Sequence, residues 1–357
     1  MNESFESLIR EWPGLAVVLR RDQPSGSWIF IALHDDRLGP PVGGTRMKPY
    51  DRPVDGLRDA MRLASGMTDK WAALGLDSGG GKAVLAVPAI LEGATRRGLL
   101  RRYGRLVESL HGGFATGRDL GTTDEDMRTL AEVTRYVHGV DKARGATRDP
   151  GPYTAAGVLA SMRAVLPRIG KDGFEGCTVV IQGVGDVGAP LARSLARQGA
   201  TLLLSDLDIA RAEDLAAELK QTVIEADAVH DTRCDIYAPC AIGATIHAES
   251  VPRLRCRAVV GSANNQLAED VDAERLAEAG ILYAPDFIAN GGGALAFGLI
   301  QRGQKDEETL LRAVAGIEQT LAAVFEVAAR RGEPTLHAAR RLVRQRLNPG
   351  PADPSES

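Results

Sequence analysis

The stretch "TVVIQGVGDVGAPLARSLARQGATLLLSD", residues 178–206, constrains the fold more than any other part of the sequence. Its first apolar residues predict a buried strand, and the glycines that follow have the spacing G-x-G-x-x-G. A helix is predicted from about Val187 to Gln198, and a second apolar run ends in Asp206. Glycines in this strand–turn–helix–strand context, with an acid about 20 residues further on, are typical of a Rossmann-type dinucleotide-binding domain.

The glycine turn and the acid also predict how a dinucleotide would bind. Small residues admit the pyrophosphate to the helix N-terminus, where the dipole and the free N–H groups favour an anion. Asp206 is expected to accept hydrogen bonds from the adenosine ribose and to repel a 2′-phosphate, which favours NAD over NADP. The predicted cofactor-binding residues of this turn are Gly183, Val184, Gly185, Asp186, Val187 and Gly188.

Length and a change in composition along the chain predict two domains. A chain of 357 residues is long enough for about two domains. Near residue 145, the stretch "KARGATRDPGPYTAAG" is dense in Gly, Pro, Arg and Asp, as connections between domains often are. We therefore expect an α/β protein with one domain over 1–145 and the Rossmann-type domain over 146–327. The polar tail 350–357 is expected to be disordered.

Charge, hydropathy and cysteine usage exclude several classes of protein. The formal net charge of −4 gives no basic field for nucleic acid. No apolar run approaches the ~18 residues of a membrane span, and the acidic N-terminus is unlike a signal peptide. The four cysteines lack the spacing of a metal site, so we expect reduced thiols, no metal and a cytoplasmic location. They are Cys177, Cys234, Cys240 and Cys256.

Two lysines of the N-terminal part stand in unusual surroundings. Lys82 follows three glycines in "DSGGGKAV", and glycine allows close approach of backbone to backbone or of backbone to a ligand. Lys70 falls on the apolar stripe of a predicted helix, beside Met67 and Leu74, where it must reach solvent or meet an anion. Two such cations could hold one substrate carboxylate. The alternatives are a tight turn before a strand, with Lys82 in solvent, and a Lys70 side chain that reaches water.

A single aspartate precedes the next predicted helix. Thr122 and Glu125 have the spacing of a capping box, so this helix is expected to begin near Thr123. Asp119 then lies on the loop just before the helix, where side chains commonly face a binding site. An ordinary turn aspartate is the alternative.

Short apolar runs near residues 236, 258 and 282 predict further buried strands. Polar loops follow them, and in an open parallel sheet such loops border the ligand site. Ala263, Asn264, Asn265 and Asn290 lie in these loops. The three asparagine amides could bond the nicotinamide ribose, its carboxamide or a substrate, or could simply form turns.

Seven motifs together resemble the glutamate/leucine/phenylalanine/valine dehydrogenase family, and its leucine and phenylalanine dehydrogenase branch most closely. They are "PVGGTRM", "GMTDKWAALGLDSGGGKAV", "GRDLGTTDEDM", "QGVGDVG", "CDIYAPCAIGAT", "GSANNQL" and "YAPDFIANGGG". The resemblance runs from about residue 30 to 345. It implies that the first domain binds the substrate and is completed by a C-terminal helix over 328–349. It also implies NAD as the cofactor, small-molecule substrates and a homo-oligomer.

The resemblance implies roles for individual residues. Lys70 would bind the substrate α-carboxylate, Lys82 would be the catalytic base, and Asp119 would move protons. Thr154, Asn264 and Asn290 would lie near the nicotinamide end of the cofactor, Ala263 would also bind the cofactor, and Asn265 would bind the substrate. The glycines before Lys82 would let the amino acid lie against the chain.

Two residues, Val42 and Ala294, are implied to line the side-chain pocket, and Gly44 is implied to bind the substrate. In glutamate-specific members of the family, lysine and serine stand where this chain has Val42 and Ala294. An apolar pocket argues against glutamate, because an unpaired buried carboxylate is costly. Both residues are small, which leaves room for a branched or an aromatic side chain.

The expected activity is therefore the reversible, NAD-dependent oxidative deamination of an apolar L-amino acid, branched-chain or aromatic. A relative without activity that binds NAD or an amino acid for regulation is the alternative. The presence of Lys70, Lys82 and Asp119 favours the enzyme.

Overall fold

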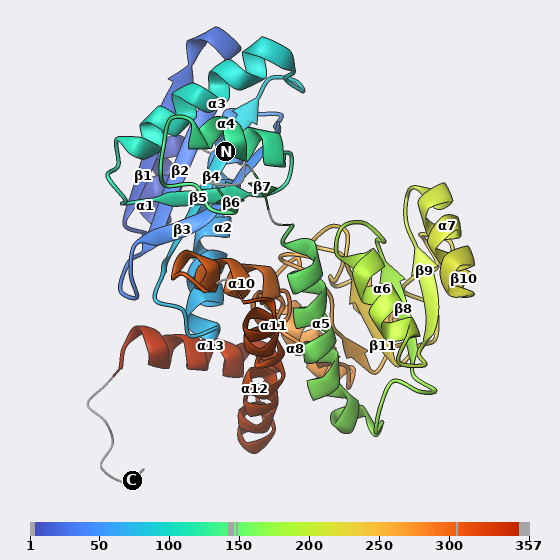
Figure 1. Cartoon of the computed structure of the whole chain (residues 1–357). Helices are drawn as coiled ribbons and strands as arrows, with labels where there is room; N and C mark the ends of the chain where they lie inside the picture. Colours follow the sequence, from blue (N-terminus) through green and yellow to red (C-terminus); the bar gives the residue numbers. More distant parts are fainter. Residues whose placement is uncertain (1–3, 142–145, 148, 305, 350–357) are drawn as a thin grey trace. The chain divides into compact units, whose positions relative to one another are not determined.

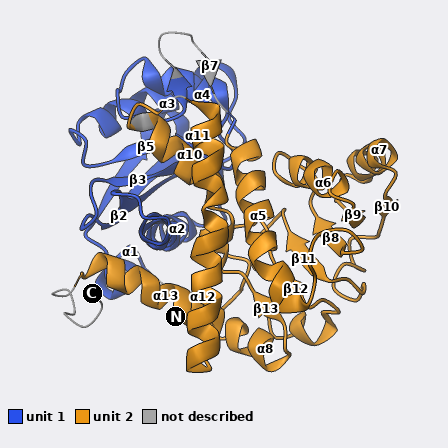
Figure 2. Cartoon of the chain, turned by 60° about the horizontal axis from the view of Figure 1, so that its bottom comes forward, with its two compact units in different colours: residues 1–149 blue, residues 150–357 orange. Residues whose placement is uncertain are grey.

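The computed structural model describes residues 4–141, 146–147, 149–304 and 306–349. Its contacts divide the chain into unit 1, residues 1–149, and unit 2, residues 150–357 (Figure 2). This division falls close to the boundary expected at residue 145, while the predicted tail over 350–357 lies outside the described residues. Within the described part of the chain, no helix combines the length and hydrophobicity that a membrane crossing needs.

Unit 1 is an α/β unit built on a mixed sheet (Figure 1). Its elements are α1 (Phe5–Glu11), β1 (Ala16–Asp22), η1 (Gln23–Ser25), β2 (Ser27–Asp35), β3 (Pro41–Pro49), α2 (Pro53–Ala73), β4 (Gly79–Val87), α3 (Gly93–Glu108), β5 (Ala115–Arg118), α4 (Asp124–Ala131), β6 (Val140–Asp141) and β7 (Ala146–Thr147). The strand order is β1-β2-β4-β3-β5, so β4 is the middle strand. It pairs antiparallel with β2 and parallel with β3.

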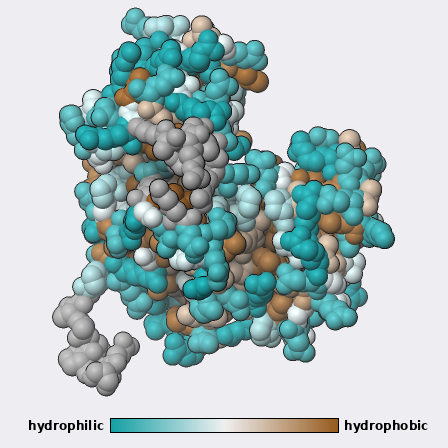
Figure 3. Space-filling model, in the orientation of Figure 1, coloured by the Kyte–Doolittle hydropathy of each residue, from teal (hydrophilic) through white to brown (hydrophobic). Residues whose placement is uncertain are grey.

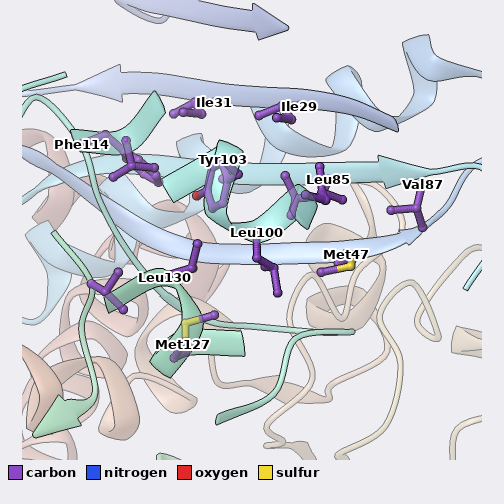
Figure 4. Close-up of a cluster of buried hydrophobic side chains, with 14 residues drawn as sticks. Ile29, Ile31, Met47, Leu85, Val87, Leu100, Tyr103, Phe114, Met127 and Leu130 are labelled. Carbon is purple, nitrogen blue, oxygen red and sulfur yellow. The ribbon is translucent and has the colours of Figure 1, made fainter. Parts of the chain in front are cut away.

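Side chains alternate between the two faces of this sheet, and each face buries its own core. On one face, β2 and β4 pack against α2 through Phe30, Ala32, Leu57, Ala60, Met61, Ala64, Val84 and Ala86. On the other face they meet α3 and α4 (Figure 4), through residues that include Ile31, Met47, Leu85, Leu100, Tyr103, Met127 and Leu130. With helices on both faces, every residue of β4 is buried.

Unit 2 contains the predicted parallel sheet. Its elements are α5 (Gly151–Val165), η2 (Leu166–Ile169), β8 (Thr178–Gln182), α6 (Gly188–Ala196), β9 (Thr201–Ser205), α7 (Ile209–Leu219), β10 (Thr222–Val223), β11 (Ile236–Pro239), η3 (Val251–Arg253), β12 (Ala258–Val259), α8 (Asp272–Glu278), β13 (Leu282–Tyr283), α9 (Asp286–Ala289), α10 (Gly292–Gln301), α11 (Glu307–Ala315), α12 (Ile317–Arg331) and α13 (Thr335–Leu347).

The order β10-β9-β8-β11-β12-β13, with all neighbours parallel, is that of a Rossmann fold. The strand order reverses between β8 and β11: β9 and β10 are added on one side of β8, whereas β11, β12 and β13 are added on the other. Ligands bind at such switch points. The predicted fold class is confirmed: a first α/β unit is followed by a Rossmann-type unit.

The prediction of a single helix over 328–349 is wrong. Residues 328–331 end α12, Gly332 follows in the left-handed region at φ 63°, and a new helix, α13, begins after Pro334. Glycine and proline separate the two helices because glycine ends helices readily and proline cannot continue one. Within unit 2, α13 packs on α12 and β13. Its expected part in completing the first domain stays a prediction.

Hydrophilic residues cover most of the face drawn in Figure 3, as expected when apolar residues fill the cores.

Candidate active site

The glycines before Lys82 are needed for packing against protein. They form the start of β4. A Cβ on Gly80 would lie 1.9 Å from Thr68 Oγ1 of α2, and a Cβ on Gly79 would lie 2.1 Å from the Asp35 carbonyl oxygen. Protein atoms therefore fill the side-chain positions of Gly79 and Gly80, and the expectation that these glycines let a substrate lie against the chain stays a prediction.

Lys82 is buried on β4, with 5 % of its surface exposed. It shares a sheet face with Val84 and Ala86, which pack towards α2. Its Nζ lies 2.8 Å from Asp119 Oδ2, and both side chains are largely buried. The alternative in which Lys82 reaches solvent from a turn is thereby excluded.

Asp119 follows β5 directly, and a local hydrogen-bond network fixes its backbone. Its N–H donates to Thr122 Oγ1 at 2.9 Å, and Thr122 Oγ1 lies 3.0 Å from the Thr45 carbonyl oxygen on β3. The capping box is one residue later than predicted: Thr123 is the N-cap and pairs with Asp126. As expected, the helix begins directly after this loop.

Arg46 on β3 was not identified from the sequence, although it lies within the motif "PVGGTRM". Its Nε lies 3.3 Å from Asp119 Oδ2, and its Nη1 lies 2.9 Å from Asp59 Oδ2 on α2. Asp59 Oδ2 also accepts a hydrogen bond from Tyr50 at 2.6 Å. Charges of alternating sign therefore run from Lys82 to Asp59 along this face of the sheet. Strand alternation could have identified Arg46, because it lies two residues after Gly44, a predicted substrate residue, and therefore on the same face of the sheet.

The two cations control the ionisation of Asp119. Burial alone raises the pKa of the Asp119 carboxyl, but Lys82 and Arg46 outweigh it and lower the pKa to about 2. Asp119 is consequently a carboxylate at neutral pH.

The other predicted substrate residues of unit 1 lie on α2 and β3. Lys70 is half-buried near the end of α2. Beside it, Trp71 Nε1 donates to the Val42 carbonyl oxygen at 3.0 Å and ties α2 to β3. Gly44 allows the close approach of Asp119, whose Cβ would lie 2.8 Å from a Cβ at this position. These residues therefore gather around the α2 side of β3.

His138 is a second residue that sequence reasoning missed. A Cβ on Gly117 of β5 would lie 3.6 Å from His138 Cβ, and Gly117 pairs with Gly44 of β3. The buried Nε2 of His138 has no hydrogen-bond partner among the described residues. Burial lowers the pKa of His138 to about 4, so the ring is neutral.

In unit 2 the glycine turn connects β8 to α6 tightly. Gly183 has φ +96°, and a Cβ on Gly188 would lie 1.9 Å from the Gly183 carbonyl oxygen. By contrast, no described atom lies within 4 Å of a Cβ placed on Gly185. The first and third glycines thus serve the protein, while Gly185 leaves exposed backbone that a phosphate could approach. Val184, Asp186 and Val187 complete this turn.

Asp206 lies at the end of β9 beside the turn. Its Oδ2 accepts a hydrogen bond from Val184 N–H at 2.8 Å, and its Oδ1 accepts one from Asp208 N–H at 3.0 Å. Arg211 Nη1 lies 3.6 Å from the same carboxylate. The chain therefore holds Asp206 in place without any ligand.

Two of the predicted nicotinamide-end residues, Asn264 and Asn290, lie together within unit 2. Asn290 is buried, and its Nδ2 donates to Asn264 Oδ1 at 2.9 Å and to the Ser262 carbonyl oxygen at 3.2 Å. Among the described residues, Asn290 Oδ1 accepts no hydrogen bond. Asn265 adopts φ +52°, and its N–H donates to Asp286. Ala263, buried in this loop, contributes its carbonyl to Gln266.

Thr154 and Ala294 lie in the helical part of unit 2. Thr154 Oγ1 donates to the Pro150 carbonyl oxygen at 3.0 Å in the first turn of α5. A Cβ on Gly293 would lie 2.6 Å from Thr154 Oγ1, so α10 approaches α5 closely beside Ala294. The predicted cofactor residues of unit 2 fit a dinucleotide for two reasons. Gly185 leaves its backbone open to a phosphate, and among the described residues Asn290 Oδ1 accepts no hydrogen bond.

Comparisons with known proteins agree with this arrangement. Residues 21–136 match the family model "Glu/Leu/Phe/Val dehydrogenase, dimerisation domain", and residues 206–347 match "Glutamate/Leucine/Phenylalanine/Valine dehydrogenase". The leucine dehydrogenase of Thermoactinomyces intermedius is 40 % identical over 332 residues, which is 93 % of this chain and 90 % of that protein.

The chain belongs to the Glu/Leu/Phe/Val dehydrogenase family.

Other relatives within the Glu/Leu/Phe/Val dehydrogenase family have different names. The L-tryptophan dehydrogenase of Nostoc punctiforme is 40 % identical and covers 89 % of both chains. The phenylalanine dehydrogenase of Lysinibacillus sphaericus is 38 % identical over 93 % of this chain and 88 % of that protein. The crystal structure of L-tryptophan dehydrogenase from Nostoc punctiforme matches with a TM-score of 0.80 at 36 % identity, over 97 % of this chain and 99 % of that one.

Membership of the Glu/Leu/Phe/Val dehydrogenase family supports amino acid dehydrogenase activity for this chain. It also confirms the predicted cofactor class, a nicotinamide dinucleotide such as NAD. The predicted leucine and phenylalanine branch of the family is confirmed as well.

Proposed function

We propose that this chain catalyses the reversible, NAD-dependent oxidative deamination of an apolar L-amino acid. The products are the 2-oxo acid, ammonium and NADH. One observation carries the proposal: a buried lysine and a buried carboxylate, Lys82 and Asp119, lie 2.8 Å apart on one face of the sheet. A proton can pass directly between groups at this distance.

In the proposed reaction, Lys70 binds the α-carboxylate and so places Cα and the amino group beside Lys82. Bound NAD would supply the acceptor for the hydride of Cα, so that a substrate with a neutral amino group would become an iminium ion. In the base form that the reaction requires, the Lys82 amine takes a proton from water as the water oxygen bonds to Cα. Lys82 passes that proton to the Asp119 carboxylate 2.8 Å away, and Asp119 delivers it to the carbinolamine nitrogen. As the C–N bond breaks, the hydroxyl group gives its proton to Asp119 and becomes the carbonyl. Ammonia leaves and takes up that proton as ammonium.

Unit 2 supplies the residues proposed to hold the cofactor. The backbone of Gly183 to Gly188 would take the pyrophosphate at the start of α6, and Asp206 would take the adenosine ribose. Thr154, Asn264 and Asn290 would bind near the nicotinamide. Asn290 is suited to this role because its Oδ1 still lacks a hydrogen bond within the described structure.

The substrate is proposed to be apolar because Val42 and Ala294 carry no charge. Burial of a γ-carboxylate there without a cation would cost several kcal/mol. Gly44 and Asn265 complete the proposed substrate residues. We also propose a homo-oligomer, because the family model matched over residues 21–136 is described as a dimerisation domain.

A panel of L-amino acids with NAD tests the proposal, with NADH formation followed by absorbance. The panel contains leucine, valine, isoleucine, phenylalanine, tryptophan and glutamate, and Lys82→Ala serves as the inactive control. We expect activity on several apolar members and little on glutamate. NADH binding without turnover of any member would instead favour the regulatory alternative.

A further inference from the structure

Arg46 occupies a position that the proposed reaction leaves unexplained. Its guanidinium lies between two carboxylates, with Nε 3.3 Å from Asp119 and Nη1 2.9 Å from Asp59. The three side chains are only 12–16 % exposed. An arginine is rarely buried this deeply unless its planar donors are fully used.

Asp119 needs an anchor for its side chain as well as for its backbone. Thr122 fixes the backbone N–H, but this contact leaves the carboxylate free to rotate about its own torsions. The carboxylate oxygen that meets Lys82 is also the one that meets Arg46. Arg46 therefore restricts the side chain to the rotamer in which Oδ2 faces the lysine.

We propose that Arg46 is a positioning residue for proton transfer, because it fixes the Asp119 carboxylate where it faces Lys82. The inference rests on the proposed function, in which these two groups exchange the proton. Misplacement of a catalytic group by about 1 Å costs roughly 10²-fold in rate, so an anchor of this kind has a measurable effect.

Asp59 and Tyr50 in turn hold Arg46. Asp59 Oδ2 accepts from Arg46 and from the Tyr50 hydroxyl, while its Oδ1 accepts from Arg62 at 3.1 Å. Burial opposes the charge of Arg46, but Asp119 and Asp59 together raise its pKa. The guanidinium thus stays charged and fixed at both ends.

The anchor also affects ionisation, which gives a second readout. The charged and titratable groups around Asp119 are Lys82 on β4, Arg46 on β3, Asp59 on α2 and Tyr50. A neighbouring arginine lowers a carboxyl pKa by about 1–3 units, so its loss should raise the pKa of Asp119 by a similar amount. The variant would then lose activity at a higher pH than the native protein as the solution is acidified.

Arg46→Gln tests the inference, with Arg62→Gln as the matched control. Both variants remove an arginine from Asp59, but Arg62 is exposed and its ion pair is with Asp59 rather than with Asp119. For the amino acid that the native protein oxidises fastest, we expect kcat of Arg46→Gln to fall about 10–10²-fold. KM should stay within about threefold, and Arg46→Lys should recover part of the rate. Arg62→Gln should stay within about twofold of native.

A titration that needs no activity separates this inference from the proposed function. With ¹³C-labelled aspartate carboxyls, the Asp119 signal is identified by its loss in Asp119→Asn. We expect its midpoint to move upward in Arg46→Gln and to stay in place in Arg62→Gln. If the native protein oxidises no amino acid but the midpoint moves, the proposed function fails and the Asp119 contact stands. If Arg46→Gln matches Arg62→Gln in both kcat and midpoint, Arg46 has no positioning role.

Discussion

The glycines of unit 1 and those of unit 2 look alike in sequence but have opposite structural roles. At the start of β4, Gly79 and Gly80 are filled up to their backbone by other parts of the protein. In the turn after β8, Gly185 faces no described atom at all within 4 Å of a Cβ position. One set of glycines brings secondary structure together, and the other keeps backbone open.

The polar groups of the two regions differ in the same way. In unit 1, Lys82 and Asp119 are already paired, so the chemistry is built from side chains that hold one another. In unit 2, the turn presents backbone N–H groups, and Asn290 keeps a free acceptor among the described residues. The difference teaches that a paired, buried site is suited to moving protons, whereas open backbone is suited to binding an anion.

The largest expected effect comes from breaking the pair of unit 1. Lys82→Ala should lower turnover by about 10²–10⁴-fold, because the group that takes the proton is lost. Asp119→Asn should act in the same direction, since an amide cannot carry the proton. NADH binding, measured by fluorescence, should survive in both variants because the proposed cofactor residues lie in unit 2. The control is Lys171→Ala, which removes a lysine that pairs with Asp235 in unit 2. Unchanged turnover in Lys82→Ala would exclude Lys82 from the mechanism.

The contrast between the glycines can be tested by adding one methyl group to each. Gly80→Ala should destabilise the protein by at least the 1–3 kcal/mol typical of overpacked cores, because its Cβ would meet Thr68 and the Ala64 carbonyl oxygen. Gly185→Ala should leave the free energy of unfolding within about 0.5 kcal/mol but weaken NADH binding by about tenfold. Denaturant unfolding and fluorescence titration measure the two. Equal loss of stability in both variants would contradict the contrast.

A smaller effect is expected at Asp206. Asp206→Asn keeps an acceptor for Val184 N–H but removes the negative charge, and Arg211 lies nearby to meet a 2′-phosphate. The ratio of NADP to NAD efficiency should therefore rise by about ten- to a hundredfold, the range of a charge-assisted hydrogen bond. Asp208→Asn, on an exposed residue that also binds Arg211, should leave the ratio unchanged. A native enzyme that used both cofactors equally would refute this role for Asp206.

The smallest expected effect concerns the substrate pocket. Ala294→Val should shift the preference from aromatic towards branched aliphatic substrates. The shift should be about tenfold, since one methylene in a pocket is worth about 1–3 kcal/mol. Competing assays with phenylalanine and leucine measure it. An unchanged ranking would place the pocket on other residues.

The sequence was sufficient for the features that depend on local pattern. The turn from Gly183 to Gly188, the strand before it and the acid at Asp206 all lie within one short stretch, so periodicity and spacing were enough. The break at Gly332 was missed because the arginine-rich helix pattern continues across it, although Gly332 and Pro334 were available signals for the end of a helix.

Features that depend on contacts between distant segments could not be predicted in the same way. The role of Gly80 depends on the packing of α2 on β4. The sequence does not show which residues of α2 face Gly80, so this contact could not be predicted. Arg46 meets Asp119 across 73 positions of the chain, so its partners were hidden even though its motif was noticed. Local pattern therefore gave the elements, while tertiary packing decided which charges became neighbours.

The place of Lys82 on the middle strand of its sheet has a consequence for how the protein would fail. Amide hydrogens of β4, covered by strands on both edges and helices on both faces, should exchange with solvent only through the global opening of unit 1. Fraying of an edge strand such as β1 would leave the lysine in place. Asp119, by contrast, directly follows β5 at the other edge of the sheet. Heat should therefore separate the lysine from its partner by loosening this edge, before the amide hydrogens of β4 exchange.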